Sequence, residues 1–208
     1  MTTALSDVVV RCIQIGPIGI IGLGIAEKLF PFVPSYALFV VIGIVLAAGQ
    51  LDLTTAIPAL ALGSTAGSLC WYAVGRALGK QRSETFVQRF GRCVGLTPIR
   101  YQRTTAAFQR YPFVIIACSQ TIPVVRVYMA IPAGILGVSL MHFLPGTFIG
   151  SLVWSGSLLA LGSWIGNTNT DPVVAGLAAI TALVALEGAI VYGCRRLRRS
   201  RPEPCPRD

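Results

Sequence analysis

An arginine in the middle of an apolar stretch constrains the fold of this chain more than any other residue. The stretch covers residues 111–137, YPFVIIACSQTIPVVRVYMAIPAGILG, and contains Arg126 between Pro123 and Pro132. A guanidinium at the centre of a bilayer costs about 2.5–3.5 kcal/mol even on lenient insertion scales. Each proline also removes a helix hydrogen bond that hydrocarbon cannot replace. The stretch therefore predicts a re-entrant hairpin whose broken tip, near residues 121–127, lines a polar cavity.

The composition indicates an integral membrane protein. Of 208 residues, 54% are hydrophobic and 12% are charged, which is too apolar for a soluble domain of this length. Fourteen of the 17 basic residues lie in two segments, 76–110 and 194–208. If both segments face the cytoplasm, the positive-inside rule accounts for the net charge of +9 without a nucleic-acid partner. Contact of the tail with anionic lipid is an additional expectation.

The N-terminal part of the chain shows the same combination of features. An apolar run ends at Glu27 and Lys28, and Pro31 and Pro34 follow. This pattern predicts a second broken hairpin at about residues 17–49, with Glu27 near the break. The N-terminus lacks a basic region and a small-residue cleavage site before the apolar run, so no cleaved signal peptide is expected.

The other segments complete a single membrane domain over residues 1–193. About 20 helical residues cover the hydrocarbon core, and glycines four residues apart, such as Gly63 and Gly67, suit close helix packing. Thr97 and Pro98 are expected to start a helix at the cytoplasmic interface. In chain order the predicted layout is the first hairpin at about 17–49, a spanning helix at about 55–78, a cytoplasmic amphipathic segment at 79–110, the second hairpin at about 111–137, spanning helices at about 142–166 and 172–193, and a basic cytoplasmic tail at 194–208.

The charge distribution also predicts how the two hairpins are oriented. With both basic segments in the cytoplasm, the second hairpin enters from the cytoplasmic face and the first from the opposite face. Each is followed by a spanning helix, which is the pattern of an inverted repeat. The expected fold is thus an all-α polytopic membrane protein with two oppositely oriented re-entrant hairpins. Folds of this kind place their substrate site near the midplane.

Three blocks of the sequence resemble the DedA family of the VTT-domain superfamily, also called SNARE-associated-like proteins. The blocks are EKLFPFVPS, GSTAGSLCWYAVGRALG and TIPVVRVYMAIPAG, and the resemblance covers about residues 27–166. The matching residues are Glu27, Pro31, Pro34, Ser35, Gly63, Gly67, Tyr72, Gly75, Arg76, Gly79, Pro123, Arg126, Ala133, Gly134, Phe143, Gly150, Trp154, Gly162 and Gly166.

The resemblance implies a function as well as a fold. It implies two facing re-entrant hairpins in the inner membrane of a bacterium and a role in moving lipids across that membrane. Bacterial members of the family are associated with envelope maintenance, undecaprenyl phosphate recycling, phospholipids such as phosphatidylethanolamine, and dependence on the proton motive force. A polyprenyl phosphate or a phospholipid headgroup is accordingly the expected partner, and no cofactor is implied.

The chain departs from the family pattern at two positions. Tyr36 stands where an acidic residue commonly follows the proline of the first hairpin, and Gln120 stands where an arginine commonly precedes that of the second. We hypothesise that the two family residues interact, and that Tyr36 and Gln120 replace their charged contact with a neutral hydrogen bond. The departures leave Glu27 as the one carboxylate on the predicted hairpins, which weakens the expectation of proton coupling.

The candidate site combines Arg126 with Glu27. Arg126 stays ionised and offers a planar fork of donors that suits a phosphate headgroup. Glu27 is suited to pair with Arg126 at rest, to orient an amine-bearing headgroup, or to take up a proton. The alternative is a buried ion pair that only holds the hairpins together. The broken helix ends at Pro31, Pro34 and Pro123 add free backbone groups for an anion, and Ser35, Tyr36, Gln120 and Tyr128 are secondary candidates.

Other functions compete with lipid movement. A proton-coupled transporter of small solutes or ions would use the same Glu27 and Arg126. An enzyme is disfavoured, because the sequence shows no paired carboxylates, no histidine with an acidic partner and no nucleophile elbow near the hairpins. The six cysteines have no CxxC spacing, and no metal site is expected. His142 is expected at a membrane interface, and Glu187 faces either a neighbouring helix or a second subunit of a homo-oligomer.

Overall fold

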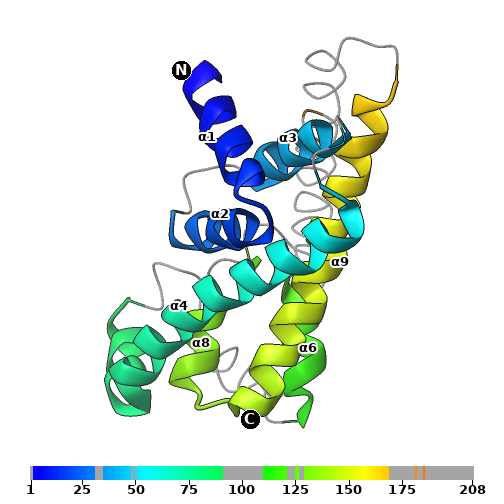
Figure 1. Cartoon of the computed structure of the whole chain (residues 1–208). Helices are drawn as coiled ribbons and strands as arrows, with labels where there is room; N and C mark the ends of the chain where they lie inside the picture. Colours follow the sequence, from blue (N-terminus) through cyan, green and yellow to red (C-terminus); the bar gives the residue numbers. More distant parts are fainter. Residues whose placement is uncertain are drawn as a thin grey trace.

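The fold is helical throughout the part of the chain that the structure describes. This computed structural model describes residues 2–30, 35–47, 49, 51–90, 110–120, 125–126, 129–168, 181 and 185, and these contain no strand. The helices are α1 (Thr2–Gln14), α2 (Pro17–Leu29), α3 (Ser35–Ala47), α4 (Leu53–Phe90), α6 (Pro112–Ser119), α8 (Ala130–Ile135) and α9 (Leu140–Gly166) (Figure 1). The predicted all-α class is confirmed for these segments.

Two of the described helices are long and apolar enough to cross a membrane. They are the Leu53–Gly79 part of α4 and the whole of α9, each with 27 residues. At 1.5 Å per residue each is about 40 Å long, which exceeds the hydrocarbon core of about 30 Å. The two helices are in contact and cross one another near the centre of the molecule (Figure 1). The helices expected at about 55–78 and 142–166 correspond to these two.

The other helices of the described chain are too short to span a bilayer singly. α2 and α3 have 13 residues each, which is about 20 Å, and α6 and α8 have 8 and 6. α2 and α3 lie toward one end of the crossed pair, and α6 and α8 lie toward the other (Figure 1). α2 packs on α4 and α3 on α9, whereas α6 packs on α9 and α8 on α4. In each pair of short helices, one helix therefore packs on α4 and the other on α9. The first helix of the pair packs on α4 in α2–α3 and on α9 in α6–α8.

Glycines allow these helices to pack closely. A Cβ added to Gly24 of α2 would lie 2.7 Å from the carbonyl oxygen of Leu60 in α4, and one added to Gly43 of α3 would lie 2.9 Å from the Cα of Gly162 in α9. Gly63 similarly lies against the backbone of α2. Because any side chain at these points would separate the backbones, the helices depend on small residues there. The predicted packing role of Gly63 is confirmed.

Prolines and one glycine set the helix boundaries. Pro17 and Pro112 start α2 and α6, where a missing N–H costs no hydrogen bond. The sequence predicts a helix break at Pro132 within the second hairpin, and this prediction is wrong. Pro132 is the third residue of α8, within the first helical turn, where backbone N–H groups have no partner inside the helix. Gly16, with φ 87°, separates α1 from α2.

Several predicted segments lie wholly or mostly outside the described residues. The polar segment expected at 79–110 begins as a continuation of α4 to Phe90, across a non-helical Gly79 with φ 70° and ψ 160°. The expected helix start at Thr97 lies outside the description. So do the tail at 194–208 and the spanning helix at 172–193, apart from Thr181 and Ala185.

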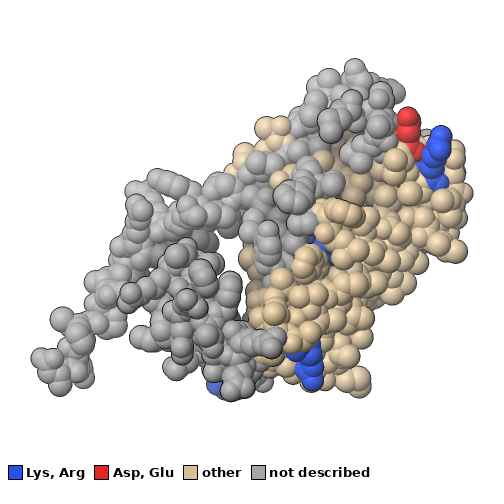
Figure 2. Space-filling model, turned by 90° about the vertical axis from the view of Figure 1, so that its left-hand side faces the viewer, with Lys and Arg blue, Asp and Glu red and all other residues tan. Residues whose placement is uncertain are grey.

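The surface of the described region is suited to a lipid environment. Figure 2 shows a broad face almost without Lys, Arg, Asp or Glu, with charged side chains mainly toward its two ends. Large apolar side chains are exposed along both long helices, including Leu62 and Leu69 of α4 and Ile149 and Val153 of α9. An uncharged surface with many exposed large apolar side chains would be unfavourable in water and matches the apolar interior of a bilayer.

Candidate functional site

Buried polar side chains form a layer between two apolar cores. The first core includes Leu60 of α4 and Leu158 of α9, and the second includes Tyr72 of α4 and Phe143 of α9. Between these positions each long helix turns polar side chains inward. The buried hydroxyl residues of this polar layer are Ser64, Thr65 and Ser68 on α4, and Thr147, Ser151 and Ser155 on α9.

The polar layer lies halfway along both long helices. The midpoint of Leu53–Gly79 is residue 66, and the midpoint of Leu140–Gly166 is residue 153. The spacings of the hydroxyl residues, 64 and 68 on α4 and 147, 151 and 155 on α9, place each set on one helical face. Sequence reasoning missed this layer, although the spacing of four residues was a visible signal for it.

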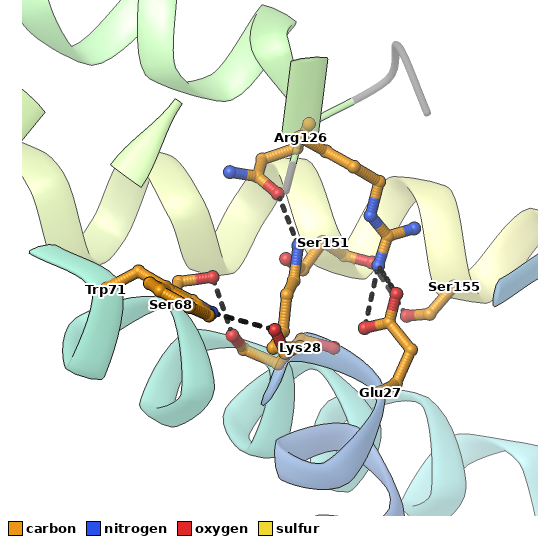
Figure 3. Close-up of polar contacts among 9 residues, drawn as sticks. Glu27, Lys28, Ser68, Trp71, Arg126, Ser151 and Ser155 are labelled. Carbon is orange, nitrogen blue, oxygen red and sulfur yellow. Dashed lines mark hydrogen bonds and ion pairs between the residues drawn. The ribbon is translucent and has the colours of Figure 1, made fainter. Parts of the chain in front are cut away.

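Four side chains from opposite ends of the molecule meet at this layer. Glu27 and Lys28 come from the end of α2, Gln120 follows α6, and Arg126 lies in the segment between α6 and α8. We refer to these four residues as the charged cluster. Their exposed fractions are 3%, 1%, 2% and 1%, respectively, so the cluster is sealed from solvent in this conformation. Figure 3 shows Arg126 reaching toward Glu27 beside Ser151 and Ser155.

Arg126 is only partly satisfied within the charged cluster. Its Nη2 donates to both carboxylate oxygens of Glu27, at 3.0 and 3.2 Å. Its Nε and Nη1 are buried and have no hydrogen-bond partner among the described residues. The guanidinium lies over the rings of Phe39 and Trp154, 5.4 and 5.5 Å from their centroids, so cation–π attraction holds it in place. Arg126 thus keeps two donor nitrogens free in a fixed orientation.

Lys28 is the residue that sequence reasoning missed. Its ammonium donates to Gln120 Oε1 at 3.2 Å, and Trp71 Nε1 donates to its backbone oxygen at 2.9 Å. In the sequence Lys28 marks the end of an apolar run, which is typical of a residue at the water interface. The signal against that interpretation was the sequence that follows it, because the next charged residue is Asp52. Uncharged runs on both sides of the Glu27–Lys28 pair indicate that the lysine lies within the membrane domain.

Gln120 has a different partner from the one expected. We hypothesised a hydrogen bond between Gln120 and Tyr36, but Gln120 accepts its hydrogen bond from Lys28. Tyr36 is half-buried and packs against the first apolar core. The expected contact between them is therefore wrong, because docking of α2 brings a lysine to Gln120.

The other sequence-predicted site residues are placed as follows. Ser35 is buried at the start of α3. His142 is exposed in the first turn of α9, as expected for an interfacial residue. The predicted breaks at Pro31, Pro34 and Pro123, together with Tyr128 and Glu187, lie outside the described residues. Within the described part of the chain, no group of three or more His, Cys, Asp and Glu side chains is placed to hold a metal ion.

The electrostatics of the charged cluster favour an additional anion. When its three ionisable groups are charged, two positive charges face one carboxylate. No Asp or Glu occurs in 31–34, 121–124 or 127–128, the segments nearest the cluster in the sequence. A buried ion is unfavourable unless it is paired, and each buried donor left without an acceptor adds about 1–3 kcal/mol. An anion that accepts from Arg126 and Lys28 would relieve both costs.

The long apolar helices and the buried ionic cluster between the shorter ones define a polytopic helical membrane protein. Comparison with known families identifies it further, because the model of the VTT domain matches residues 33–164. The chain belongs to this family, and the resemblance to DedA proteins inferred from the sequence is confirmed. No solved structure matches the chain.

The curated relatives are bacterial proteins. The chain is 29% identical over 180 residues to an "Alkaline phosphatase-like protein" of Lactococcus lactis, covering 86% of this chain and 84% of the relative. It is 27% identical to "Undecaprenyl phosphate transporter A" of Staphylococcus aureus, covering 65% and 67%. A protein of the same name from Bacillus subtilis is 26% identical, with 82% of each chain covered.

Proposed function

We propose that this protein is a lipid translocase that carries the headgroup of a phosphate-bearing lipid across the membrane through the polar layer. The observation that carries the proposal is the pair of buried donors, Nε and Nη1 of Arg126, that have no acceptor among the described residues. Arginine binds phosphate through two parallel hydrogen bonds, and each of the two guanidinium edges that can do so combines Nη2 with one of these free nitrogens.

The architecture supports this proposal. We take α2 with α3, and α6 with α8, as two re-entrant hairpins that enter from opposite faces of the membrane. Each helix is too short to span, and each pair contacts both long helices in exchanged order. The charged cluster lies where the hairpins meet, level with the midpoints of α4 and α9. Transporters with inverted repeats bind their substrates at such a position.

Glu27 has a defined part in the proposed cycle. In the resting state its carboxylate neutralises Arg126 and accepts hydrogen bonds from Nη2 alone. A phosphate that binds either edge of the guanidinium through two hydrogen bonds would compete with Glu27 for Nη2 and loosen the contact between α2 and the second hairpin. The ion pair is then both a substrate site and a connection between the hairpins. Proton uptake by Glu27 would release Arg126 in the same way, which makes a pH gradient a test of coupling.

The relatives support a polyprenyl phosphate as one candidate substrate. Two of them are named undecaprenyl phosphate transporters, and this lipid presents a phosphate on an apolar chain. The exposed apolar faces of α4 and α9 would let such a chain stay in the bilayer while the phosphate crosses the polar layer. A glycerophospholipid is the second candidate substrate.

The experiment that tests the proposal is a lipid-flip assay in proteoliposomes. Undecaprenyl phosphate and phosphatidylethanolamine are followed in parallel, with and without a pH gradient, for wild type, Arg126→Ala and Arg126→Lys. Arg76→Ala is the matched control, because Arg76 is exposed and bonded to Tyr72, outside the polar layer. We expect movement by wild type and Arg76→Ala, none by Arg126→Ala, and reduced movement by Arg126→Lys, which keeps the charge but loses the fork.

Other results of the same assay would contradict the proposal. If folded wild type moves neither lipid, the competing solute or ion transporter is favoured. If Arg126→Ala moves lipid as fast as wild type, the cluster does not recognise the headgroup. Release of inorganic phosphate during the assay would indicate hydrolysis, whereas transport leaves the lipid intact.

A further inference from the structure

Lys28 supplies a second buried cation in addition to Arg126. Its ammonium carries three donors, and the described residues provide one acceptor, the Gln120 side-chain oxygen at 3.2 Å. The carboxylate of the neighbouring Glu27 bonds to Arg126 instead. Lysine is almost never fully buried unless it is paired with an anion. The unmatched charge on Lys28 is therefore a feature that needs a ligand or a counter-ion.

The helices around Lys28 are shaped to hold it inside. A Cβ added to Gly67 of α4 would lie 2.6 Å from Lys28 Cβ and 3.2 Å from its Cγ, so a glycine makes the space for the lysine stem. Trp71, one turn further along α4, holds the Lys28 backbone oxygen. Because both residues belong to α4, the same helix provides the space for the stem and fixes the backbone from which it extends.

Gln120 is accommodated in the same manner on the opposite long helix. A Cβ added to Gly150 of α9 would lie 2.7 Å from Gln120 Cβ and 2.8 Å from its Cγ. Two glycines on two helices thus make room for the two members of one hydrogen-bonded pair. Figure 3 shows Lys28 and Arg126 extending from opposite sides toward the region of Ser151. The two cations therefore belong to one site.

We propose that Lys28 is a specificity residue that makes this site prefer a lipid phosphate monoester to a zwitterionic phosphodiester lipid. The inference rests on the proposed function and defines its substrate class. A phosphate monoester carries about 1.5 to 2 negative charges near pH 7 and three free oxygens. Arg126 takes oxygens with its two free nitrogens, and Lys28 neutralises the second charge. A phosphodiester has one charge, and an attached amine would meet two cations.

The test compares lipids and variants in one flip assay. The probes are a polyprenyl monophosphate and phosphatidylethanolamine, each measured alone with wild type, Lys28→Gln, Lys28→Arg and the exchange Lys28→Gln/Gln120→Lys. We expect wild type to move the monophosphate faster. Lys28→Gln should slow the monophosphate by about tenfold or more, the effect of losing one hydrogen bond to a charged group, and leave phosphatidylethanolamine within about twofold. Lys28→Arg and the exchange variant should keep the preference, since each retains a cation in this pair.

The outcomes separate this inference from the proposed function. If Arg126→Ala stops movement and folded Lys28→Gln keeps the preference, the inference is wrong while the translocase proposal stands. If Arg126→Ala has no effect, the translocase proposal itself fails. Glu187→Gln controls for loss of another charge from an apolar run, and an equal loss of preference there would contradict a substrate role for Lys28. Thermal melting verifies that each variant is folded, and Lys28→Met, which also removes the charge, carries the test if Lys28→Gln does not fold.

Discussion

At the scale of single residues, the Glu27–Arg126 pair combines stability and recognition. Removing one partner of a buried ion pair leaves an uncompensated charge and typically costs about 3–5 kcal/mol, whereas replacing both partners by neutral groups is often nearly neutral. The guanidinium of Arg126 lies over the rings of Phe39 and Trp154, and both partners of the pair are almost inaccessible to solvent. A purely structural pair and a substrate site therefore predict different results for single and double variants.

The first prediction concerns these variants. Glu27→Gln should lower the free energy of unfolding by about 3–5 kcal/mol, because Arg126 stays charged and loses its carboxylate. The double variant Glu27→Gln/Arg126→Met should recover most of that stability and still move no lipid. Thermal unfolding in detergent and the flip assay measure the two effects. Ser157→Ala, at an exposed position of α9, is the neutral control. A stable double variant that still moves lipid would limit the pair to a structural role.

The sequence identified the charges of the site better than their contacts. Glu27 and Arg126 were recognisable because each is an ionisable residue in an apolar run next to prolines. Lys28 was missed because a charge at the end of an apolar run usually marks the water interface. The partner of Gln120 could not be predicted, since it depends on how α2 docks against the second hairpin, and no local pattern encodes that.

At the scale of helices, close packing at glycines decides where the charged side chains go. Gly67 lies against the stem of Lys28. The close approach of α2 to α4 at this glycine therefore positions the Lys28 side chain within the charged cluster. Gly22, on α2 itself, provides a matched comparison, because a Cβ added there would have no atom of another element within 4 Å. Both glycines lie within helices, but only Gly67 is in contact with another helix.

The second prediction follows from that difference. Gly67→Ala should destabilise the protein by about 1–3 kcal/mol, because the new methyl group overlaps Lys28 and must push α2 away from α4. Gly22→Ala should be neutral or slightly stabilising, since alanine favours a helix. Chemical or thermal denaturation in detergent compares the two variants. Equal effects of both substitutions would show that the α2–α4 contact does not depend on Gly67.

Helix positions followed from the sequence more closely than helix breaks. The bounds expected for the helices at 55–78 and 142–166 differ from those of the two long apolar helices by no more than two residues at either end, because hydropathy and glycine spacing are local properties. Pro132 was misjudged because proline has opposite effects in the first turn and in the interior of a helix, and the sequence alone did not show where α8 begins.

At the scale of the whole molecule, the long helices run in opposite directions. Arg76 near the end of the α4 span and Leu140 at the start of α9 line one cavity of about 810 Å³, together with Gly137 and Ser139. Leu53 at the start of α4 and Ile165 near the end of α9 both pack in the first apolar core, which contains Leu60 and Leu158. The start of α9 and the end of the α4 span are therefore on one side, and Asn167 is at the far end.

The third prediction tests this arrangement in the membrane. In a variant without native cysteines, His142→Cys and Asn167→Cys place single thiols at exposed positions beside the two ends of α9. A membrane-impermeant maleimide should label position 167 in intact spheroplasts and position 142 only after permeabilisation, because the basic segments are expected in the cytoplasm. Labelling of both positions from the same side would contradict a spanning α9.

The proposed transport depends on phosphate recognition by Arg126, and this recognition can be measured as binding without transport. Purified protein in detergent is titrated with a short polyprenyl monophosphate, or with the matching alcohol, and its thermal unfolding is followed for wild type and Arg126→Gln. A ligand that binds only the native state stabilises it by about 2.7 kcal/mol at a hundredfold excess over Kd. We expect the phosphate to raise the wild-type Tm well above the effect of the alcohol, and this difference to vanish in Arg126→Gln. An equal response of the folded variant to phosphate would contradict the assignment of the site.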